Sequence, residues 1–409
     1  MEKVKLLYIS KYVPYDTVPH AGGKVHNFYI KYFEKSGLVD QTLITQGYSF
    51  EEKSFDLDKY NIKNRTFVMD RTVLQKWIRI VISGWSYINP FDRYCNLMLN
   101  YERYHIKKAV REYYRENRGN KAPQVIILQW TQIVLILPFV KKLFPESKIV
   151  AIEEDVLFLN FERRCALTTG LLKKYIAEYQ YHKLKKMELE VLKQADLVVT
   201  NNPKDTRLLV ENKILPGHIY TSTVYFTDYS KVVRNKNGND VLFYGAMNRE
   251  ENNSAALWFI DHVMPELDQN IRFIIVGANP TKQLQSRQSE RVIVKGFVKD
   301  VGVYFSSCLC MVAPLLLGAG IKVKVLEAMS AGVPVLTNEV GIEGIQAESG
   351  IHYFHCNSAE KYNETIELIR NDREKAAEVS RHAREFISEN YDIENNANEI
   401  LKWISNACN

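Results

Sequence analysis

Short, continuous apolar segments alternate along the chain with longer segments of helical periodicity. The first apolar segment is Val4–Ser10, and a loop with Gly22 and Gly23 separates it from a helix expected over about 24–36. Runs of Val, Ile and Leu without polar alternation are typical of parallel strands covered on both faces. Further strands of the first half are expected at 41–45, 124–128, 148–152 and 196–200.

The second half repeats this scheme. Its strands are expected near 241–244, 272–276, 292–295, 309–313, 333–337 and 352–354. Strands that alternate with helices form right-handed βαβ units and doubly wound parallel sheets. The polar, turn-forming segment 231–240 separates the two halves. The pattern therefore predicts an α/β protein of two domains, 1–232 and 233–390, whose strand ends face a central cleft.

One glycine-rich segment points to a ligand. Gly318-Ala319-Gly320-Ile321-Lys322 leads into a helical pattern that carries Glu327. Glycines let backbone N–H groups approach a ligand closely, and the positive end of the following helix favours an anion. Lys322 or Lys324 can add a positive charge for a phosphate, and a carboxylate two turns into the helix can accept hydrogen bonds from a ribose diol. The segment predicts a pocket for a diphosphate attached to a sugar, against the alternative of a plain loop before a solvated helix.

Composition narrows the choice of partners. The chain of 409 residues is 46% hydrophobic and 25% charged, with a net charge of +6, which suits soluble domains of about 200 residues each. The charge fits anionic small molecules or an acidic membrane surface and is too weak to indicate nucleic acid. The six cysteines lack metal-ligand spacing, which favours buried free thiols. With no signal peptide and no apolar run of ~18 residues, we expect a cytoplasmic protein, with contact to the inner face of the membrane left open.

The order of several motifs resembles the retaining family 4 glycosyltransferases (glycosyl transferases group 1). The resemblance rests on the loop at Gly23, on the glycine segment above and on Tyr244-Gly245, Val276-Gly277, Gly296-Phe297-Val298-Lys299-Asp300, Leu326-Glu327-Ala328-Met329 and Gly341-Ile342-Glu343-Gly344. The resemblance implies a GT-B fold of two Rossmann-like domains, with residues 391–409 forming a helix that crosses back to the first domain. It also implies transfer of a sugar, with retained configuration, from a nucleotide diphosphate sugar to an acceptor hydroxyl. The donor would be UDP- or GDP-linked, and the product a bacterial polysaccharide or glycoconjugate.

Roles follow from the resemblance for individual residues. Glu327 would hold the ribose hydroxyls. The diphosphate would meet Gly318, Gly320, Ile321 and Lys322, with Lys324 as the alternative lysine. The remaining donor-binding candidates are Gly22, Gly23, Gly245, Arg249, Gly277, Phe297 and Val298, of which the last two would offer backbone groups to the nucleobase. No metal or other cofactor is expected, because backbone amides, a helix N-terminus and basic side chains would carry the charge of the leaving diphosphate.

Two positions depart from the family pattern. Ala319 stands where relatives usually have a Glu, although a subgroup with Gly-x-Gly-x-Lys works without it. Glu154 stands where many relatives have a His beside the transferred sugar. A carboxylate there can accept hydrogen bonds from a sugar hydroxyl or shield an oxocarbenium-like centre. The competing interpretation is that Glu153, Glu154 and Asp155 are an idle, solvated strand end. The catalytic candidates are therefore Glu154, Lys322 and Glu327.

Other segments leave alternatives open. A catalytically silent binding subunit that partners an active transferase would account for Ala319 and Glu154. A GT-B epimerase is the third alternative, but this chain lacks the set of acidic and histidine residues that such an enzyme needs. The acceptor could be a saccharide, a lipid-linked sugar or another glycoconjugate. Residues 74–85, and a basic helix expected over 163–186, could rest on an anionic membrane. His20 and His26 are interpreted as structural, with contact of His20 to the acceptor or donor left open because it lies beside Gly22 and Gly23. Tyr8 and Trp130 are interpreted as core residues.

Overall fold

A computed structural model describes residues 3–18, 21–70, 72–92, 94, 97–235, 238–317 and 321–407. The chain divides into two compact units, one formed by Met1–Thr223 with Ile393–Asn409 and the other by Val224–Asp392. Residues 224–232 therefore fold with the second unit, although the sequence placed them in the first domain. Phe226 is buried in the core of the second unit, and the backbone N–H groups of Thr227 and Tyr229 donate to Glu327 and Ser330.

The first unit is built on a seven-stranded parallel sheet with the order β3-β2-β1-β4-β5-β6-β7. Its strands are β1 (Val4–Ser10), β2 (Val39–Tyr48), β3 (Lys63–Met69), β4 (Val125–Gln129), β5 (Lys148–Glu153), β6 (Leu197–Thr200) and β7 (Ile219–Thr221). All five strands expected in this half are present. The outer strands β3 and β7 were not foreseen, because their residues are mostly half-buried and their sequences are not continuously apolar.

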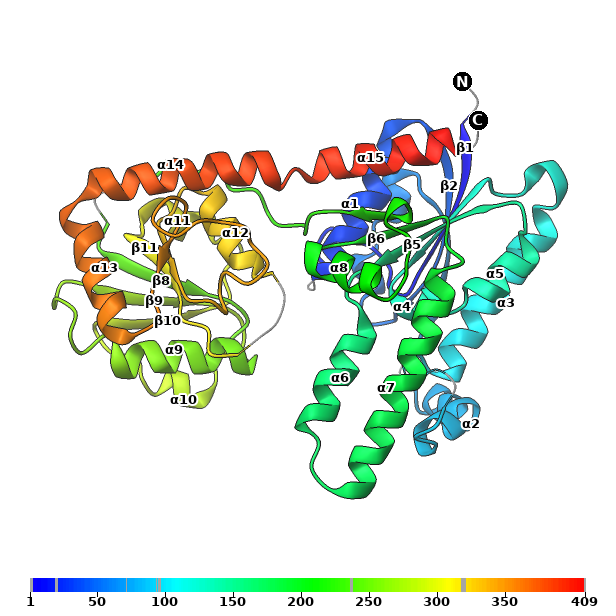
Figure 1. Ribbon diagram of the computed structural model, residues 1–409, viewed down its shortest axis with the longest axis horizontal. Coiled ribbons are helices and arrows are strands. Elements are labelled where there is room, and N and C mark those ends of the chain that lie inside the picture. Colours follow the sequence, from blue (N-terminus) through cyan, green and yellow to red (C-terminus); the bar gives the residue numbers. More distant parts are fainter. Residues whose placement is uncertain are drawn as a thin grey trace. The chain divides into compact units, whose positions relative to one another are not determined.

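The helices of the first unit are α1 (Ala21–Ser36), α2 (Val73–Ile88), α3 (Asn100–Glu116), α4 (Thr131–Val134), α5 (Leu137–Leu143), α6 (Leu157–Leu167), α7 (Leu171–Leu192), α8 (Pro203–Glu211) and α15 (Ile393–Asn406). The single basic helix expected over 163–186 is wrong. The chain turns at residues 168–170, where Gly170 has a φ of 92°, and α6 and α7 run side by side as a hairpin (Figure 1).

The second unit contains a six-stranded parallel sheet with the order β10-β9-β8-β11-β12-β13. Its strands are β8 (Asp240–Tyr244), β9 (Arg272–Val276), β10 (Val292–Gly296), β11 (Cys310–Ala313), β12 (Val335–Thr337) and β13 (Phe354–His355), all expected from the sequence within two residues or so at their ends. The helices are α9 (Glu250–His262), α10 (Lys282–Gln285), α11 (Gly302–Ser307), α12 (Val323–Ser330), α13 (Ala359–Asn371) and α14 (Arg373–Asn390).

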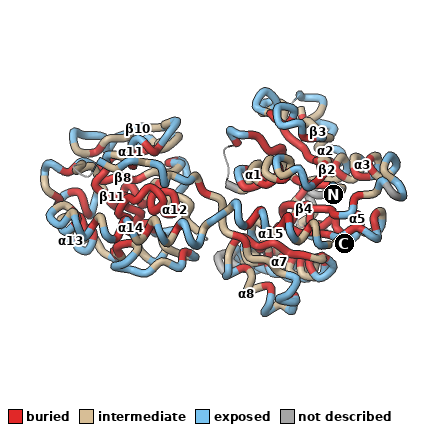
Figure 2. Tube along the Cα trace, turned by 90° about the horizontal axis from the view of Figure 1, so that it is seen from above, coloured by how far each residue is buried: buried red, intermediate tan, exposed pale blue. Residues whose placement is uncertain are grey.

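Buried side chains are concentrated on the central strands of each sheet and on the helix faces against them (Figure 2). β4 is buried along its whole length, and so is β11, as expected for parallel strands covered on both faces. Side-chain hydrogen bonds begin several helices: Asn202 caps α8, Ser358 caps α13 and Asp372 caps α14.

Helix α15 completes the first unit. Asn396 on this helix accepts from Tyr220 Oη at 2.7 Å and donates to Thr223 Oγ1, and Asn398 accepts from Tyr32 Oη at 2.9 Å. In the part of the chain that the structure describes, no helix combines the length and the apolar character needed to cross a membrane.

Candidate functional site

In the second unit, candidate side chains gather where the strands end and α12 begins. Lys322 is the residue directly before α12, and its side chain is only 10% exposed. Its Nζ lies 3.8 Å from the carboxylate of Glu343, while Ile321 packs against Gly344. The segment 341–344 thus supports the approach to α12. Gly318 and Gly320, which were predicted to contact the diphosphate, lie outside the described residues, and so does Ala319 between them.

Glu327 is held in place by two donors inside the second unit. It lies on the second turn of α12 and is 7% exposed. One carboxylate oxygen accepts from the backbone N–H of Thr227 at 3.2 Å, and the other accepts from the hydroxyl of Tyr244 at the end of β8. Burial and the neighbouring Glu327 raise the pKa of Tyr244 well above its usual value, so Tyr244 remains a donor. Each carboxylate oxygen keeps a further acceptor position, which a diol could use.

Lys324 has different side-chain contacts from Lys322. Its Nζ donates to Asn252 on α9 and lies 4.6 Å from the centre of the Phe243 ring. Burial lowers its pKa from the usual value to about 7; Arg249 and Lys322 act in the same direction, and Glu251 and Glu327 oppose it. Lys324 therefore ties the start of α12 to α9. Asn252 was not predicted from the sequence, because a single Asn inside a helix carries no spacing signal.

Gly277 lets the ends of β8 and β9 approach each other closely, and Gly245 leaves room for neighbouring side chains. A Cβ at Gly277 would lie 1.7 Å from the carbonyl oxygen of Gly245, and a Cβ at Gly245 would lie 2.9 Å from Lys324 Nζ. The N–H of Gly277 donates to the carbonyl of Gly296 at 2.7 Å. Packing inside the second unit therefore requires a small residue at Gly245 and Gly277, and donor binding by these two glycines stays a prediction.

The other donor-site candidates lie at the surface of the same unit. Phe297 follows β10 and is 74% exposed, whereas Val298 packs against the core. Arg249 precedes α9, and its exposed guanidinium makes an ion pair with Glu251 at 2.7 Å. An exposed pair of this kind contributes little to stability, so Arg249 can exchange its partner for a ligand anion.

In the first unit, Glu154 follows β5 and is partly buried. Gln129 Nε2 donates to one of its carboxylate oxygens at 2.5 Å, and Asn201 Nδ2 donates to the other at 2.7 Å. The buried hydroxyl of Tyr8 donates to Gln129 Oε1 and so fixes the amide of Gln129. Burial raises the pKa of Glu154 from its usual value to about 7; Asp155 adds to the rise, and the two amide donors oppose it. Glu154 is therefore an oriented carboxyl group that titrates near neutral pH.

The structure places the Gly22 loop against this carboxyl group. A Cβ at Gly22 would lie 3.5 Å from Glu154 Cδ and 3.3 Å from the indole nitrogen of Trp130. Gly23 is buried one residue further along α1, which begins three residues earlier than expected. His26 and Trp130 are buried, and their ring centres are 5.1 Å apart. His20 lies outside the described residues.

The two acidic neighbours of Glu154, Glu153 and Asp155, differ from it in burial and in hydrogen bonding. Glu153 is 1% exposed and accepts from Thr131 Oγ1, and burial raises its pKa well above the usual value, with Glu188 adding to the rise. Asp155 is exposed. The three carboxyl groups thus do not form one solvated strand end. Over the described ranges, no group of three or more His, Cys, Asp or Glu side chains is arranged to hold a metal ion.

Part of the second unit matches a known protein family. Residues 238–372, which lie entirely within the second unit, match the family described as "Glycosyl transferases group 1". A curated relative, an uncharacterized 44.6 kDa protein in the cps region of Klebsiella pneumoniae, is 24% identical over 176 residues. That match covers 40% of this chain and 45% of the relative, so it spans less than half of either protein.

Solved structures resemble the chain over nearly its full length. Anabaena Alr3699/HepE in complex with UDP has a TM-score of 0.65 at 12% identity, and the match covers 98% of this chain and 100% of that one. Sucrose-phosphate synthase from Thermosynechococcus elongatus has a TM-score of 0.66 at 13% identity, with 98% of both chains covered. These likenesses, together with the two parallel-sheet units, show a GT-B fold, as the sequence predicted.

Proposed function

We propose that this protein is a retaining glycosyltransferase that moves a sugar from a UDP- or GDP-linked donor to an acceptor hydroxyl. The observation that carries the proposal is the arrangement at α12, where Lys322 precedes the helix and Glu327 is oriented by Tyr244. This arrangement lies inside the segment that matches the glycosyl transferases group 1 family. Structures of HepE contain UDP and UDP-glucose, which is consistent with a nucleotide donor here.

In this proposal the second unit binds the nucleotide. Glu327 accepts hydrogen bonds from the two ribose hydroxyls, and Lys322 with the N-terminal end of α12 faces the diphosphate. The bond between the anomeric carbon and the diphosphate oxygen breaks, and the negative charge that develops on that oxygen is stabilised by these groups. No metal ion is required, because a lysine and oriented backbone dipoles can supply this stabilisation.

Glu154 has the properties of a group that contacts the sugar. Its two amide donors, Gln129 and Asn201, favour the carboxylate form and fix its direction. A fixed carboxylate can accept a hydrogen bond from a sugar hydroxyl and stabilise positive charge at the anomeric carbon in the transition state. In the absence of a histidine at this position, we assign this role to Glu154.

The acceptor is proposed to be a growing bacterial polysaccharide or another glycoconjugate, presented at an anionic membrane. The curated relative carries the words "in cps region" in its name, which supports a role in polysaccharide synthesis. α2 exposes large apolar side chains, including Val81 at 78% and Trp85 at 70%, and the turn of the α6–α7 hairpin exposes Leu171 at 92%. Phe91, just after α2, packs on Tyr179 of α7 with ring centres 4.7 Å apart, so the two regions are neighbours in the first unit.

Vesicle binding tests the membrane contact. Vesicles of phosphatidylglycerol should retain the protein at low salt, and the double substitution Leu171→Ser and Leu172→Ser should release it. Leu215→Ser is a matched control, because Leu215 is 65% exposed in the same unit but lies away from these segments in sequence. Equal retention of both variants, or no retention of the unmodified protein, would exclude this contact.

Nucleotide binding tests the central proposal. UDP, GDP and ADP, with their common sugar conjugates, should be compared by thermal shift and calorimetry on the unmodified protein and on Glu327→Gln. At ~100 times its dissociation constant, the correct nucleotide should stabilise the protein by about 2.7 kcal/mol. Gln keeps the shape of the side chain but not its charge, and the stabilisation should largely disappear. Glu364→Gln, at an exposed position of α13, is the control that should bind normally.

Sugar transfer or hydrolysis of the donor must accompany binding. A nucleotide that binds without any hydrolysis of its sugar conjugate would favour a catalytically silent subunit. Absence of stabilisation by all three nucleotides would contradict the donor site itself.

A further inference from the structure

A pocket lies in the second unit beyond the C-terminal end of α12, where Gly332 lines it. It has a volume of about 440 Å³, and it is lined by residues just before β11 and β12, by the segment 230–234 and by α14. In a parallel sheet, residues just before the strands lie at the N-terminal ends of the strands, opposite to the carboxyl ends where the candidate donor site lies. The pocket is thus separate from the candidate donor site, and its size is within the range of small-molecule sites.

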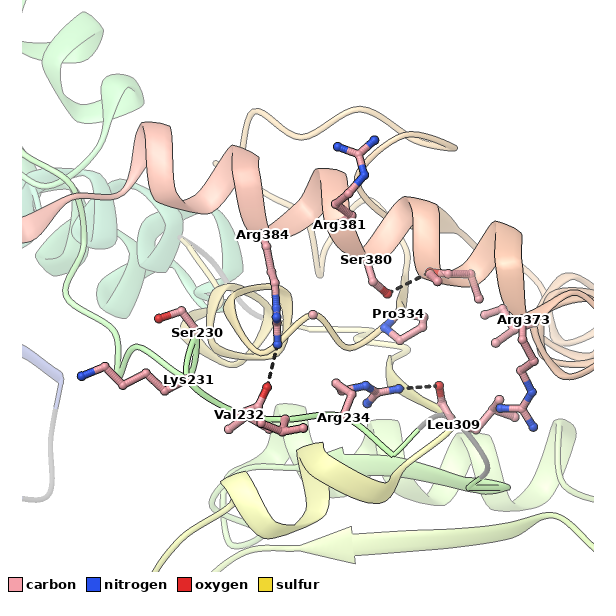
Figure 3. Close-up of a pocket in the computed structure, with 15 residues that line it drawn as sticks. Ser230, Lys231, Val232, Arg234, Leu309, Pro334, Arg373, Ser380, Arg381 and Arg384 are labelled. Atoms are coloured by element: carbon pink, nitrogen blue, oxygen red, sulfur yellow. Dashed lines mark hydrogen bonds between the residues drawn. The ribbon is translucent and has the colours of Figure 1, made fainter.

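Three arginines line this pocket: Arg234, Arg373 and Arg384. Figure 3 shows Arg384 reaching from α14 toward Val232, with Arg234 in the segment beyond it. Arg384 donates to the carbonyls of Val232 at 2.8 Å and Ala331 at 2.6 Å. Its Nη1 atom has no hydrogen bond to any described residue and is not enclosed by protein.

The other two arginines also bind only neutral groups. Arg234 donates to the carbonyls of Phe305 and Leu309, at 2.7 and 3.4 Å. Arg373 donates to the carbonyl of Gly238 at 3.2 Å and to the side-chain amide oxygen of Asn239 at 3.0 Å.

None of the three arginines has a carboxylate within ion-pair distance among the residues that the structure describes. Neighbouring arginines do: Arg370 pairs with Asp268 at 2.9 Å, and Arg381, at the rim, pairs with Glu385 at 2.7 Å. Carbonyl dipoles orient a guanidinium without cancelling its charge.

Placing these arginines together has an electrostatic cost. Burial lowers the pKa of Arg384, and the charge of Arg234 lowers it further, with partial compensation by Asp228. Burial also lowers the pKa of Arg373, and repulsion from Arg234 contributes. Arg234 therefore repels both Arg373 and Arg384, and none of the described residues that line the pocket carries a carboxylate.

We propose that this pocket binds the phosphate group of a small phosphorylated molecule. A phosphate offers several acceptor oxygens and carries up to two negative charges, which matches three guanidiniums whose remaining N–H groups have no acidic partner. The inference does not depend on the proposed transferase activity, because it rests on residues at the N-terminal ends of the strands, away from the candidate donor site.

The test uses a carboxylate placed inside the pocket. Ala377 lines the pocket on α14 and is half-buried. In Ala377→Glu the new carboxylate would satisfy the arginines from within, whereas Ala377→Gln adds the same volume without charge. Both residues are good helix formers, so α14 should be preserved.

Binding is measured by calorimetry on the full chain, with inorganic phosphate and glycerol 3-phosphate as probes and glycerol as the uncharged comparison. We expect both probes to bind the unmodified protein and Ala377→Gln with similar affinity. Their affinity for Ala377→Glu should be lower by a factor of about ten or more. Tighter binding of glycerol 3-phosphate than of phosphate would identify an organic phosphate as the ligand, and the reverse would identify the free ion.

Two further variants separate this pocket from the donor site. Arg234→Gln should weaken phosphate binding in the same way as Ala377→Glu, while Lys322→Gln should leave it unchanged. Equal affinity of Ala377→Glu and Ala377→Gln, loss of binding in Lys322→Gln, or no binding of either probe would each overturn the proposal.

Discussion

Gly22 lies directly against the carboxyl group of Glu154, since a methyl group at position 22 would be 3.5 Å from Glu154 Cδ. The two residues belong to different segments of the first unit, one at the start of α1 and the other after β5. The glycine therefore keeps one side of the carboxyl group uncovered. This relationship gives the first of four predictions.

Gly22→Ala should separate activity from stability. Alanine favours a helix over glycine by about 1 kcal/mol, and the nearest atoms leave room for a methyl group after small shifts, so the melting temperature should stay the same or rise. Donor hydrolysis should fall about tenfold or more, because the methyl group covers the approach to Glu154. Gly84→Ala on α2 is the control: its Cβ meets nothing within 4 Å, so stability should rise without a change in hydrolysis.

Glu154→Gln should remove a pH dependence of stability. The raised pKa of about 7 means that folded Glu154 holds a proton between pH 4.5 and 7 that the unfolded chain has released. The stability of the unmodified protein should therefore fall as the pH rises through this window. At pH 8 the variant should be the more stable by about 3 kcal/mol, with little difference at pH 4.5.

Chemical unfolding at these two pH values provides the measurement. Glu153 and Glu188 also have raised pKa values, and comparison with the variant cancels their contribution. In the same variant, the increase of kcat/KM through pH 7 that we expect from ionisation of Glu154 should be absent. An unchanged pH profile would assign that step to another group.

Nucleotide binding should be coupled to proton uptake through Lys324. At pH 8, a lysine with a pKa of about 7 is mostly neutral in the free protein. A diphosphate nearby favours its charged form, so up to about one proton should be taken up, and affinity should fall as the pH rises above 7. Calorimetry in buffers of different ionisation enthalpy measures this number. Lys324→Met should abolish the uptake, and a value of zero in the unmodified protein would place Lys324 beyond the influence of the ligand.

Tyr244→Phe should weaken nucleotide binding by loosening Glu327. The substitution removes the hydroxyl that donates to Glu327 and leaves the ring in place. We expect an affinity loss of about 1–2 kcal/mol, together with a similar loss of stability. Tyr220→Phe removes a comparable hydrogen bond, to Asn396 in the first unit. It should lower stability without affecting nucleotide affinity.

The central strands were predictable because each is an unbroken apolar run, and β1 and β9 begin and end at the expected residues. The outer strand β3 was not, because its sequence Lys63–Met69 mixes polar and apolar residues that are only half-buried. The division between α6 and α7 depends on Gly170, which has a positive φ. The prediction of a single helix relied on the spacing of the basic residues and took no account of this glycine.

The candidate site was predictable where residues are close in sequence. Lys322 and Glu327 follow from one helix start, but Tyr244 is 83 residues from Glu327 and could be assigned no partner from spacing. Gln129 and Asn201, which orient Glu154, were missed for the same reason. Such contacts arise from the order of the strands in the sheet, which brings the ends of β4, β5 and β6 together.

The position of α15 has a consequence for biosynthesis. The first unit consists of two separate parts of the chain, with the whole second unit between them in sequence. On the ribosome, the second unit can fold as soon as it emerges, whereas the first must wait for residues 393–406 before Tyr32 and Tyr220 find their partners on α15. The half of the protein that is translated first is therefore the half that is completed last.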